Sequence, residues 1–165
     1  MFKTKLSILL LISFIFLSCT KINVNHESKR YSIGYIGGEY DGLVLKNLLT
    51  NNLSNFGLYD TNSNYKIESS ISHSSELFIT NLDNTSDRMR VNSSLATKVY
   101  DVKFKCVTYK FNENISQFYI FADSVRYISN NKAEKKIKEE NTEELVKNFL
   151  NELMKSENRC KKMNE

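Results

Sequence analysis

Residues 88–100 alternate between two kinds of side chain more regularly than any other part of the chain. One set is mostly apolar and would share one face of a strand: Met89, Val91, Ser93, Leu95, Thr97 and Val99. The other set is polar and basic apart from Ala96: Arg88, Arg90, Asn92, Ser94, Lys98 and Tyr100. A period of two is the pattern of a β-strand with one buried face. This strand therefore needs a partner layer on one side only.

Two amphipathic helices can supply that layer. The first has an apolar stripe at helical spacing, made of Leu45, Leu48, Leu49, Leu53 and Phe56. Asp41 is predicted to be its N-cap and Gly57 to follow its end. The second stripe contains Ala133, Ile137, Leu145, Val146, Phe149, Leu150 and Leu153. Its opposite face is charged, and we expect a break at Asn141-Thr142, where the stripe is thin.

Shorter alternating runs predict the remaining strands. One covers residues 31–35 and ends at Gly37-Gly38, and another covers residues 65–71. A serine-rich link is expected at residues 72–75, with His73 as a solvated loop residue, before an extended piece at 76–80 and a turn at 81–87. A hairpin is predicted from residues 104–111 and 115–128, with Asn112, Glu113 and Asn114 as its loop.

The order of elements is thus strand, helix, several antiparallel strands and a long helix. We predict an α+β domain in which two helices pack on one face of a mostly antiparallel sheet of four to five strands. The domain is expected to cover residues 30–155 and to be followed by a charged tail at residues 156–165.

The first residues have the features of a secretory signal. Two lysines precede an apolar run from Leu6 to Leu17, and Cys19 follows Ser18. The run is shorter than the roughly 18–20 residues that a bilayer span needs. The segment resembles a bacterial lipoprotein signal, which implies removal of residues 1–18 and acylation of Cys19, with residues 19–29 as a tether. An uncleaved anchor and an ordinary secretory cut are the alternatives.

Composition argues against several classes of function. Loss of residues 1–18 lowers the net charge from +4 to about +2, which gives no case for nucleic acid as a partner. The two histidines, His26 and His73, lie near no nucleophile signature, so we expect no enzyme, no metal and no cofactor. Cys106 and Cys160 form an even pair once Cys19 is acylated. The sequence alone leaves open whether they form a disulfide.

Basic residues on the polar face of residues 88–100 are the candidate binding site. Arg88 and Arg90 project from the same face, and Lys98 lies about 27 Å further along it at roughly 3.3 Å per residue. Arginine binds phosphate groups through two parallel hydrogen bonds. The alternative is a solvated sheet face whose charges form surface ion pairs.

The ordered set of signals resembles the lipopolysaccharide-assembly lipoprotein family, LptE, from about residue 30 to residue 155. The resemblance rests on the lipoprotein signal, an early strand, and the segments 45–49, 65–67, 87–91, 96–101 and 145–153. One departure is that the Arg-Pro-Leu-Tyr-like motif that often follows the lipidated cysteine in the family is missing, and the chain contains no proline.

Membership of this family would imply a non-enzymatic role. The protein would be an outer-membrane lipoprotein, facing the periplasm and the barrel lumen, that plugs the β-barrel LptD and assists insertion of lipopolysaccharide into the outer leaflet. Arg88, Arg90 and Lys98 would be the candidate lipopolysaccharide contacts. Alternative functions are an auxiliary lipoprotein of a lipid-transport ABC system and an anchored periplasmic binding domain. A hydrolase that depends on His73 is the least favoured.

Overall fold

The computed structural model describes residues 29–78, 88–120, 127–156 and 160. The elements in chain order are β1 (Tyr31–Gly37), α2 (Glu39–Asn55), β2 (Tyr65–Phe78), β3 (Arg88–Asp101), β4 (Cys106–Ile120) and α3 (Tyr127–Lys155). The signal segment, Cys19 and the turn predicted at residues 81–87 lie outside the described residues. The predicted helix and strand order is confirmed.

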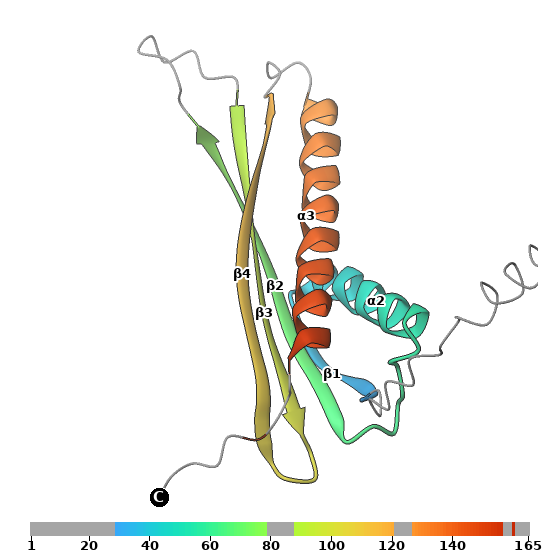
Figure 1. The fold of residues 1–165 in the computed structure, drawn as a ribbon. Helices are drawn as coiled ribbons and strands as arrows, with labels where there is room; N and C mark the ends of the chain where they lie inside the picture. The colour runs from blue at the N-terminus through green and yellow to red at the C-terminus, as the bar shows by residue number, and fades with distance from the viewer. Residues whose placement is uncertain (1–28, 79–87, 121–126, 157–159, 161–165) are drawn as a thin grey trace, which may run out of the picture.

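The strands form one open sheet with the order β1-β2-β3-β4 (Figure 1). β1 is short and pairs parallel with the start of β2, whereas β2, β3 and β4 pair antiparallel along their whole lengths. The structure therefore confirms an α+β fold with a mostly antiparallel sheet, which has four strands within the described residues. The alternation predicted for β3 is also confirmed, since Val91, Leu95 and Val99 are buried.

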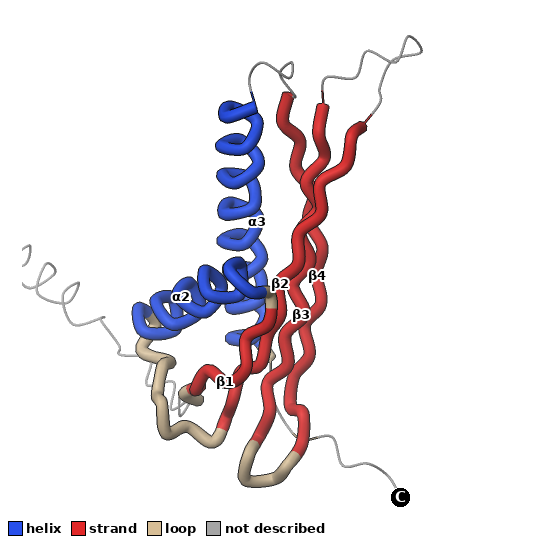
Figure 2. Tube along the Cα trace, turned by 180° about the vertical axis from the view of Figure 1, so that it is seen from behind, coloured by secondary structure: helices blue, strands red, loops and turns tan. Residues whose placement is uncertain are grey.

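Both helices cover the same face of the sheet. α3 runs along β3 and β4, while α2 lies across β1 and β2 (Figures 1 and 2). The fully buried core residues include Leu45, Leu49 and Leu53 from α2, Leu145 and Phe149 from α3, and Ile67, Leu95 and Val99 from the sheet. Burial of each such side chain contributes about 1.5–3 kcal/mol. The described residues leave the opposite face of β2, β3 and β4 uncovered.

The connection from β1 to α2 depends on Gly38. Its φ is 117°, and a Cβ there would lie 2.7 Å from the carbonyl oxygen of Ile71 on β2. Only glycine tolerates this backbone conformation and this close approach. Gly38 is therefore the N-cap of α2, and the prediction of Asp41 is wrong because Asp41 lies in the first helical turn. Gly57, with φ 67°, follows the helix end as predicted.

Two predicted interruptions of strands are absent. Residues 72–75 lie inside β2, and residues 112–114 lie inside β4, because both segments pair with β3 without a gap. The loop of the hairpin is instead residues 102–105, between Asp101 and Cys106. Serine and asparagine favour turns by composition, but here Ser72, Ser74, Asn112 and Asn114 occupy outward positions of long strands, and Ser75 donates a hydrogen bond to Glu134 on α3.

A disulfide joins Cys106, the first residue of β4, to Cys160, and their Cα atoms are 6.0 Å apart. It closes a segment with a sequence separation of 54 residues, which contributes roughly 4 kcal/mol to stability in the chain-entropy account. This link fixes the chain beyond α3 to the hairpin end of the sheet. None of the helices within the described residues has the length and apolar character needed to cross a membrane.

Candidate functional site

Arg90 is the centre of a side-chain cluster at the end of the sheet remote from the hairpin loop. It pairs in register with Glu76 on β2 and Phe118 on β4. Its Nη1 lies 3.3 Å from Glu76 Oε1, and its guanidinium carbon lies 4.3 Å from the ring centroid of Phe78 and 5.2 Å from that of Phe118. We call Glu76, Phe78, Arg90 and Phe118 the tip cluster.

The tip cluster leaves Arg90 available to an anion. The Arg90 side chain is 31% exposed, and an ion pair at such an exposed position contributes only about 0–1 kcal/mol. Ring stacking fixes the plane of the guanidinium without occupying its N–H groups. Phe118 and Ile120 expose apolar surface on the same face. The tip therefore combines a preoriented cation with apolar contact surface.

Arg88 and Lys98 lie on the same face of β3 as Arg90. Arg88 is the first residue of β3, within one alternation of Arg90, so these two arginines belong to one end of the sheet. Lys98 is eight residues further along and pairs in register with Glu68 and Lys110. These three line a separate shallow hollow of about 230 Å³. The predicted trio thus shares a face but does not form one cluster.

A second polar cluster, which was not predicted, lies between the sheet and the helices. His73 on β2 has a side chain that is only 2% exposed, so its prediction as a solvated loop residue is wrong. Its Nδ1 lies 2.7 Å from Ser93 Oγ on β3, and its Nε2 lies 3.5 Å from Thr142 Oγ1 on α3 and 3.9 Å from Asp41 Oδ2 on α2. The cluster connects four elements.

The hydrogen bonds around His73 favour one position for its ring proton. Asn141 Nδ2 donates to Ser93 Oγ at 2.8 Å, and Thr142 Oγ1 donates to the carbonyl oxygen of Lys138 at 2.7 Å. Ser93 is then free to donate to His73 Nδ1, and Thr142 to accept from Nε2–H. This arrangement suits a neutral ring with its proton on Nε2. The break expected at Asn141-Thr142 is absent, because both residues turn into this cluster within a continuous α3.

Burial lowers the pKa of His73 below its ordinary value. The carboxylate of Asp41 acts in the opposite direction, and the ammonium of Lys138 adds to the lowering. A cavity of about 300 Å³ beside the ring is lined by the first turn of α2 and the N-terminal half of α3. The walls of this cavity carry both signs of charge, including Asp41, Glu134, Lys135 and Lys138.

His73, Ser93 and Asp41 are the residue types of a hydrolase triad, but their arrangement differs from one. Ser93 is 1% exposed and is enclosed between the sheet and α3, so its hydroxyl cannot meet a substrate. Its hydrogen bonds are used by Asn141 and His73. The cluster is a buried polar connection between layers. One sequence signal points to it, because His73 has the same strand parity as the buried residues Ile67, Ser69 and Ile71.

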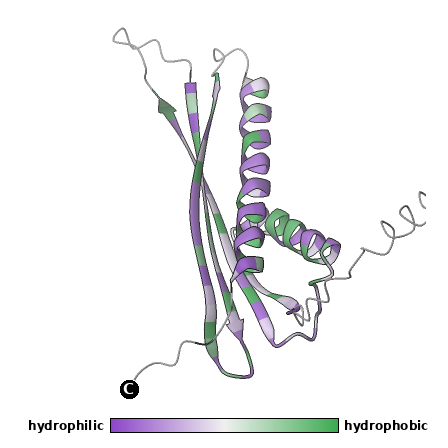
Figure 3. Ribbon diagram, in the orientation of Figure 1, coloured by the Kyte–Doolittle hydropathy of each residue, from purple (hydrophilic) through white to green (hydrophobic). Residues whose placement is uncertain are grey.

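The uncovered face of the sheet is lined by small uncharged polar side chains in its middle. They are Ser70, Ser72 and Ser74 on β2, Asn92 and Ser94 on β3, and Asn112, Asn114 and Ser116 on β4. Figure 3 shows hydrophilic residues along most of β4 and hydrophobic ones where β4 begins at the hairpin. Short hydroxyl and amide groups make a flat face that is rich in hydrogen-bond donors and acceptors.

Comparison with known proteins gives relatives by fold but not by sequence. No family model matches the chain, and no curated protein matches it. Rare lipoprotein B from Shewanella oneidensis is 12% identical, with 77% of this chain and 95% of that chain covered and a TM-score of 0.59. A lipoprotein B from Nitrosomonas europaea is 11% identical, with 76% and 82% covered and a TM-score of 0.59.

A minor lipoprotein from Acinetobacter baumannii is also similar. It is 12% identical, with 78% of this chain and 94% of that chain covered and a TM-score of 0.57. At such low identity the likeness concerns the fold alone. The chain therefore has the fold of these lipoproteins over nearly their full lengths.

The burial of His73 leads us to predict how the free energy of unfolding changes at acidic pH. Below about pH 6.5 the unfolded chain protonates His73, whereas the folded protein, with its lowered pKa, resists protonation. The unfolded state then binds more protons, so the free energy of unfolding should fall as the pH drops below about 6.5. His73→Gln should flatten this dependence, measured by urea unfolding between about pH 7.5 and 5.5.

The chain's other histidine, His26, supplies the matched control. His26→Gln should leave the pH dependence of the wild type unchanged. If the free energy of unfolding of the His73→Gln variant fell as steeply with pH as that of the wild type, the buried ring would not be the source of the pH dependence.

Proposed function

We propose that the protein is an outer-membrane lipoprotein, anchored through Cys19, that docks in the lumen of the β-barrel LptD and assists insertion of lipopolysaccharide into the outer leaflet. Three lines of support converge on this function. They are the lipoprotein signal, the sequence resemblance to the LptE family, and the fold shared with solved lipoproteins. The uncovered polar face of the sheet is the observation that carries the proposal.

The uncovered face suits the interior of an outer-membrane barrel. Such interiors are polar, so a plug must present hydrogen-bonding groups rather than an apolar surface. Serine and asparagine side chains fill the middle of the face, and they can pair with a polar wall without the large desolvation cost of buried charges. The two helices already bury the apolar face, which leaves this one for a partner.

The tip supplies groups that match lipopolysaccharide, whose phosphates and acyl chains need cations beside apolar surface. Arg88 and Arg90 provide the cations, and the exposed side chains of Phe118 and Ile120, which pair with them in register on β4, provide apolar surface on the same face. A phosphate can displace the exposed carboxylate of Glu76 from Arg90, because Glu76 contacts Arg90 through Nη1 alone, whereas a phosphate can accept two parallel hydrogen bonds. Lys98 lies beyond this group and would contact only an extended ligand.

Site-specific photocrosslinking tests the docking face. A photoreactive residue at Ser94, in the middle of the uncovered face, should form an adduct with a large outer-membrane β-barrel in intact cells. The same residue at Lys147, on the exposed side of α3, is the matched control and should form none. Adducts at position 147 in place of position 94 would contradict the proposed orientation.

Removal of the two arginines tests the ligand contact. Arg88→Ala combined with Arg90→Ala should weaken lipopolysaccharide binding roughly tenfold or more, because each charge-assisted hydrogen bond contributes about 1.5–3 kcal/mol. Binding is measured by titration of the purified protein. Lys136→Ala with Lys147→Ala removes the same charge from the outside of α3 and should have little effect. Unchanged binding by the double arginine variant would refute the assignment.

A further inference from the structure

The start of β1 and the β3–β4 hairpin loop lie at the same end of the sheet. Tyr31, at the start of β1, pairs with Tyr65, and Tyr65 pairs with Asp101, which immediately precedes the loop. Two strand spacings of about 4.8 Å separate Tyr31 from Asp101. The preceding segment, with Cys19, therefore joins the fold at this end. We call residues 102–105 the base turn.

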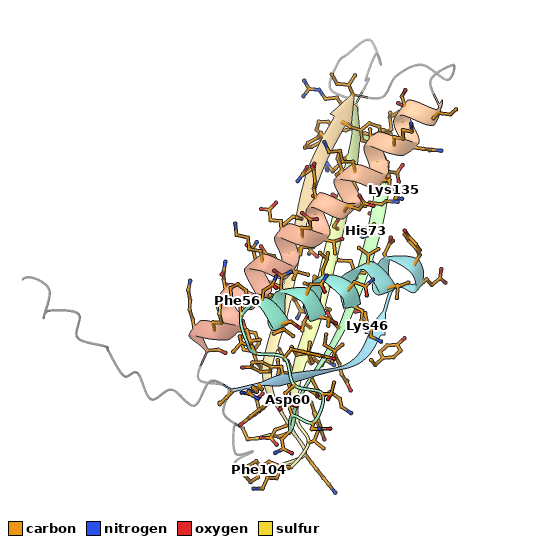
Figure 4. All side chains as sticks on the ribbon, turned by 90° about the vertical axis from the view of Figure 1, so that its right-hand side faces the viewer. Lys46, Phe56, Asp60, His73, Phe104 and Lys135 are labelled. Atoms are coloured by element: carbon orange, nitrogen blue, oxygen red, sulfur yellow. A yellow bond between two sulfur atoms is a disulfide. The ribbon has the colours of Figure 1, made fainter. Side chains whose placement is uncertain are left out.

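Apolar and basic side chains alternate along the base turn. It consists of Val102, Lys103, Phe104 and Lys105, and all four are exposed. Phe104 is 67% exposed, and Figure 4 shows it at the end of the fold opposite Lys135. Lys103 Nζ lies 5.6 Å from the Phe104 ring centroid, so cation and ring are presented together. The base turn itself contains no acidic residue.

The conformation of the base turn is held by its surroundings. Phe104 donates its backbone N–H to Asp101 Oδ1 at 3.0 Å, and Asp101 itself is buried. Val102 donates its N–H to the carbonyl oxygen of Asn64 at 2.9 Å. The disulfide of Cys106 follows directly. A preorganised turn loses little conformational entropy when its exposed ring is buried by a partner.

We propose that the base turn is a second membrane contact of this protein. Phe104 enters the interfacial region of the leaflet that holds the Cys19 acyl chains, and Lys103 and Lys105 meet anionic phospholipid headgroups. Aromatic residues favour the membrane interface, and basic residues are attracted to its negative surface potential. The inference rests on the lipid anchor of the proposed function, but it needs neither the barrel nor lipopolysaccharide.

The position of the base turn relative to the anchor favours a membrane over a protein partner. A tether of residues 19–29 spans at most about 35 Å when fully extended, so the base turn stays within reach of the bilayer. Tethering raises the local concentration of the base turn at the bilayer surface, so one aromatic ring and two lysines are enough for membrane contact. Contact at the base would direct the tip cluster away from the lipid surface.

The absence of tryptophan from the chain allows a direct test. Phe104→Trp places a single indole in the base turn, and Phe118→Trp places one in the tip cluster as a matched control. The lipidated protein is reconstituted into vesicles of phosphatidylethanolamine and phosphatidylglycerol. We expect the emission of the indole at position 104 to shift to shorter wavelength and to be quenched by brominated lipid. The indole at position 118 should do neither.

Charge reversal and flotation complete the test. Lys103→Glu with Lys105→Glu, in the Phe104→Trp background, should abolish the shift and the quenching. Flotation with the vesicles at high salt reports the acyl anchor separately. Flotation without a shift at position 104, or with a shift at position 118 alone, would overturn the base contact and leave the anchor intact. Failure to float would overturn both the anchor and the contact that depends on it.

Discussion

The packing of both helices against one face of the sheet determines most other properties of this molecule. β3 supplies the constraint, since Val91, Leu95 and Val99 are buried on the side of the helices, together with Ser93 and Thr97, while the intervening residues of β3 point to the opposite face. β2 and β4 pair with β3 along its whole length, and their side chains alternate between the same two faces of the sheet. The core is therefore complete on one side, and a long polar face remains for a partner on the other.

Elements whose side chains follow a regular helical or strand period were predictable from the sequence. The turns inferred from the serine and asparagine content of residues 72–75 and 112–114 were not correct. The alternation of apolar and polar residues predicted β3, and the apolar stripes predicted α2 and α3. Ser72 and Asn112 favour turns by composition, yet pairing with β3 kept both in strands. The true hairpin loop contains no glycine, proline or asparagine, and its one local signal is Asp101, whose carboxylate accepts the backbone N–H of Phe104. His73 was missed because its partners Ser93 and Thr142 lie far along the chain.

The two ends of the sheet have different chemistry, which gives the molecule a direction. The base carries the start of β1, the disulfide and the exposed Phe104. The tip carries Arg90 packed against the rings of Phe78 and Phe118, which also contact each other. Of the candidate binding residues, Arg88 and Arg90 belong to the tip and Lys98 does not, as the spacing of these residues along one strand predicts. An anchor at the base and a ligand site at the tip agree with a plug that points into a barrel.

Affinity purification tests the central proposal most directly. A C-terminally tagged form is purified from detergent-solubilised outer membranes, and the proteins that accompany it are identified by mass spectrometry. We predict one large outer-membrane β-barrel in stoichiometric amount. Recovery of inner-membrane permease subunits would instead favour an auxiliary role in lipid transport, and recovery of no partner would contradict the barrel complex.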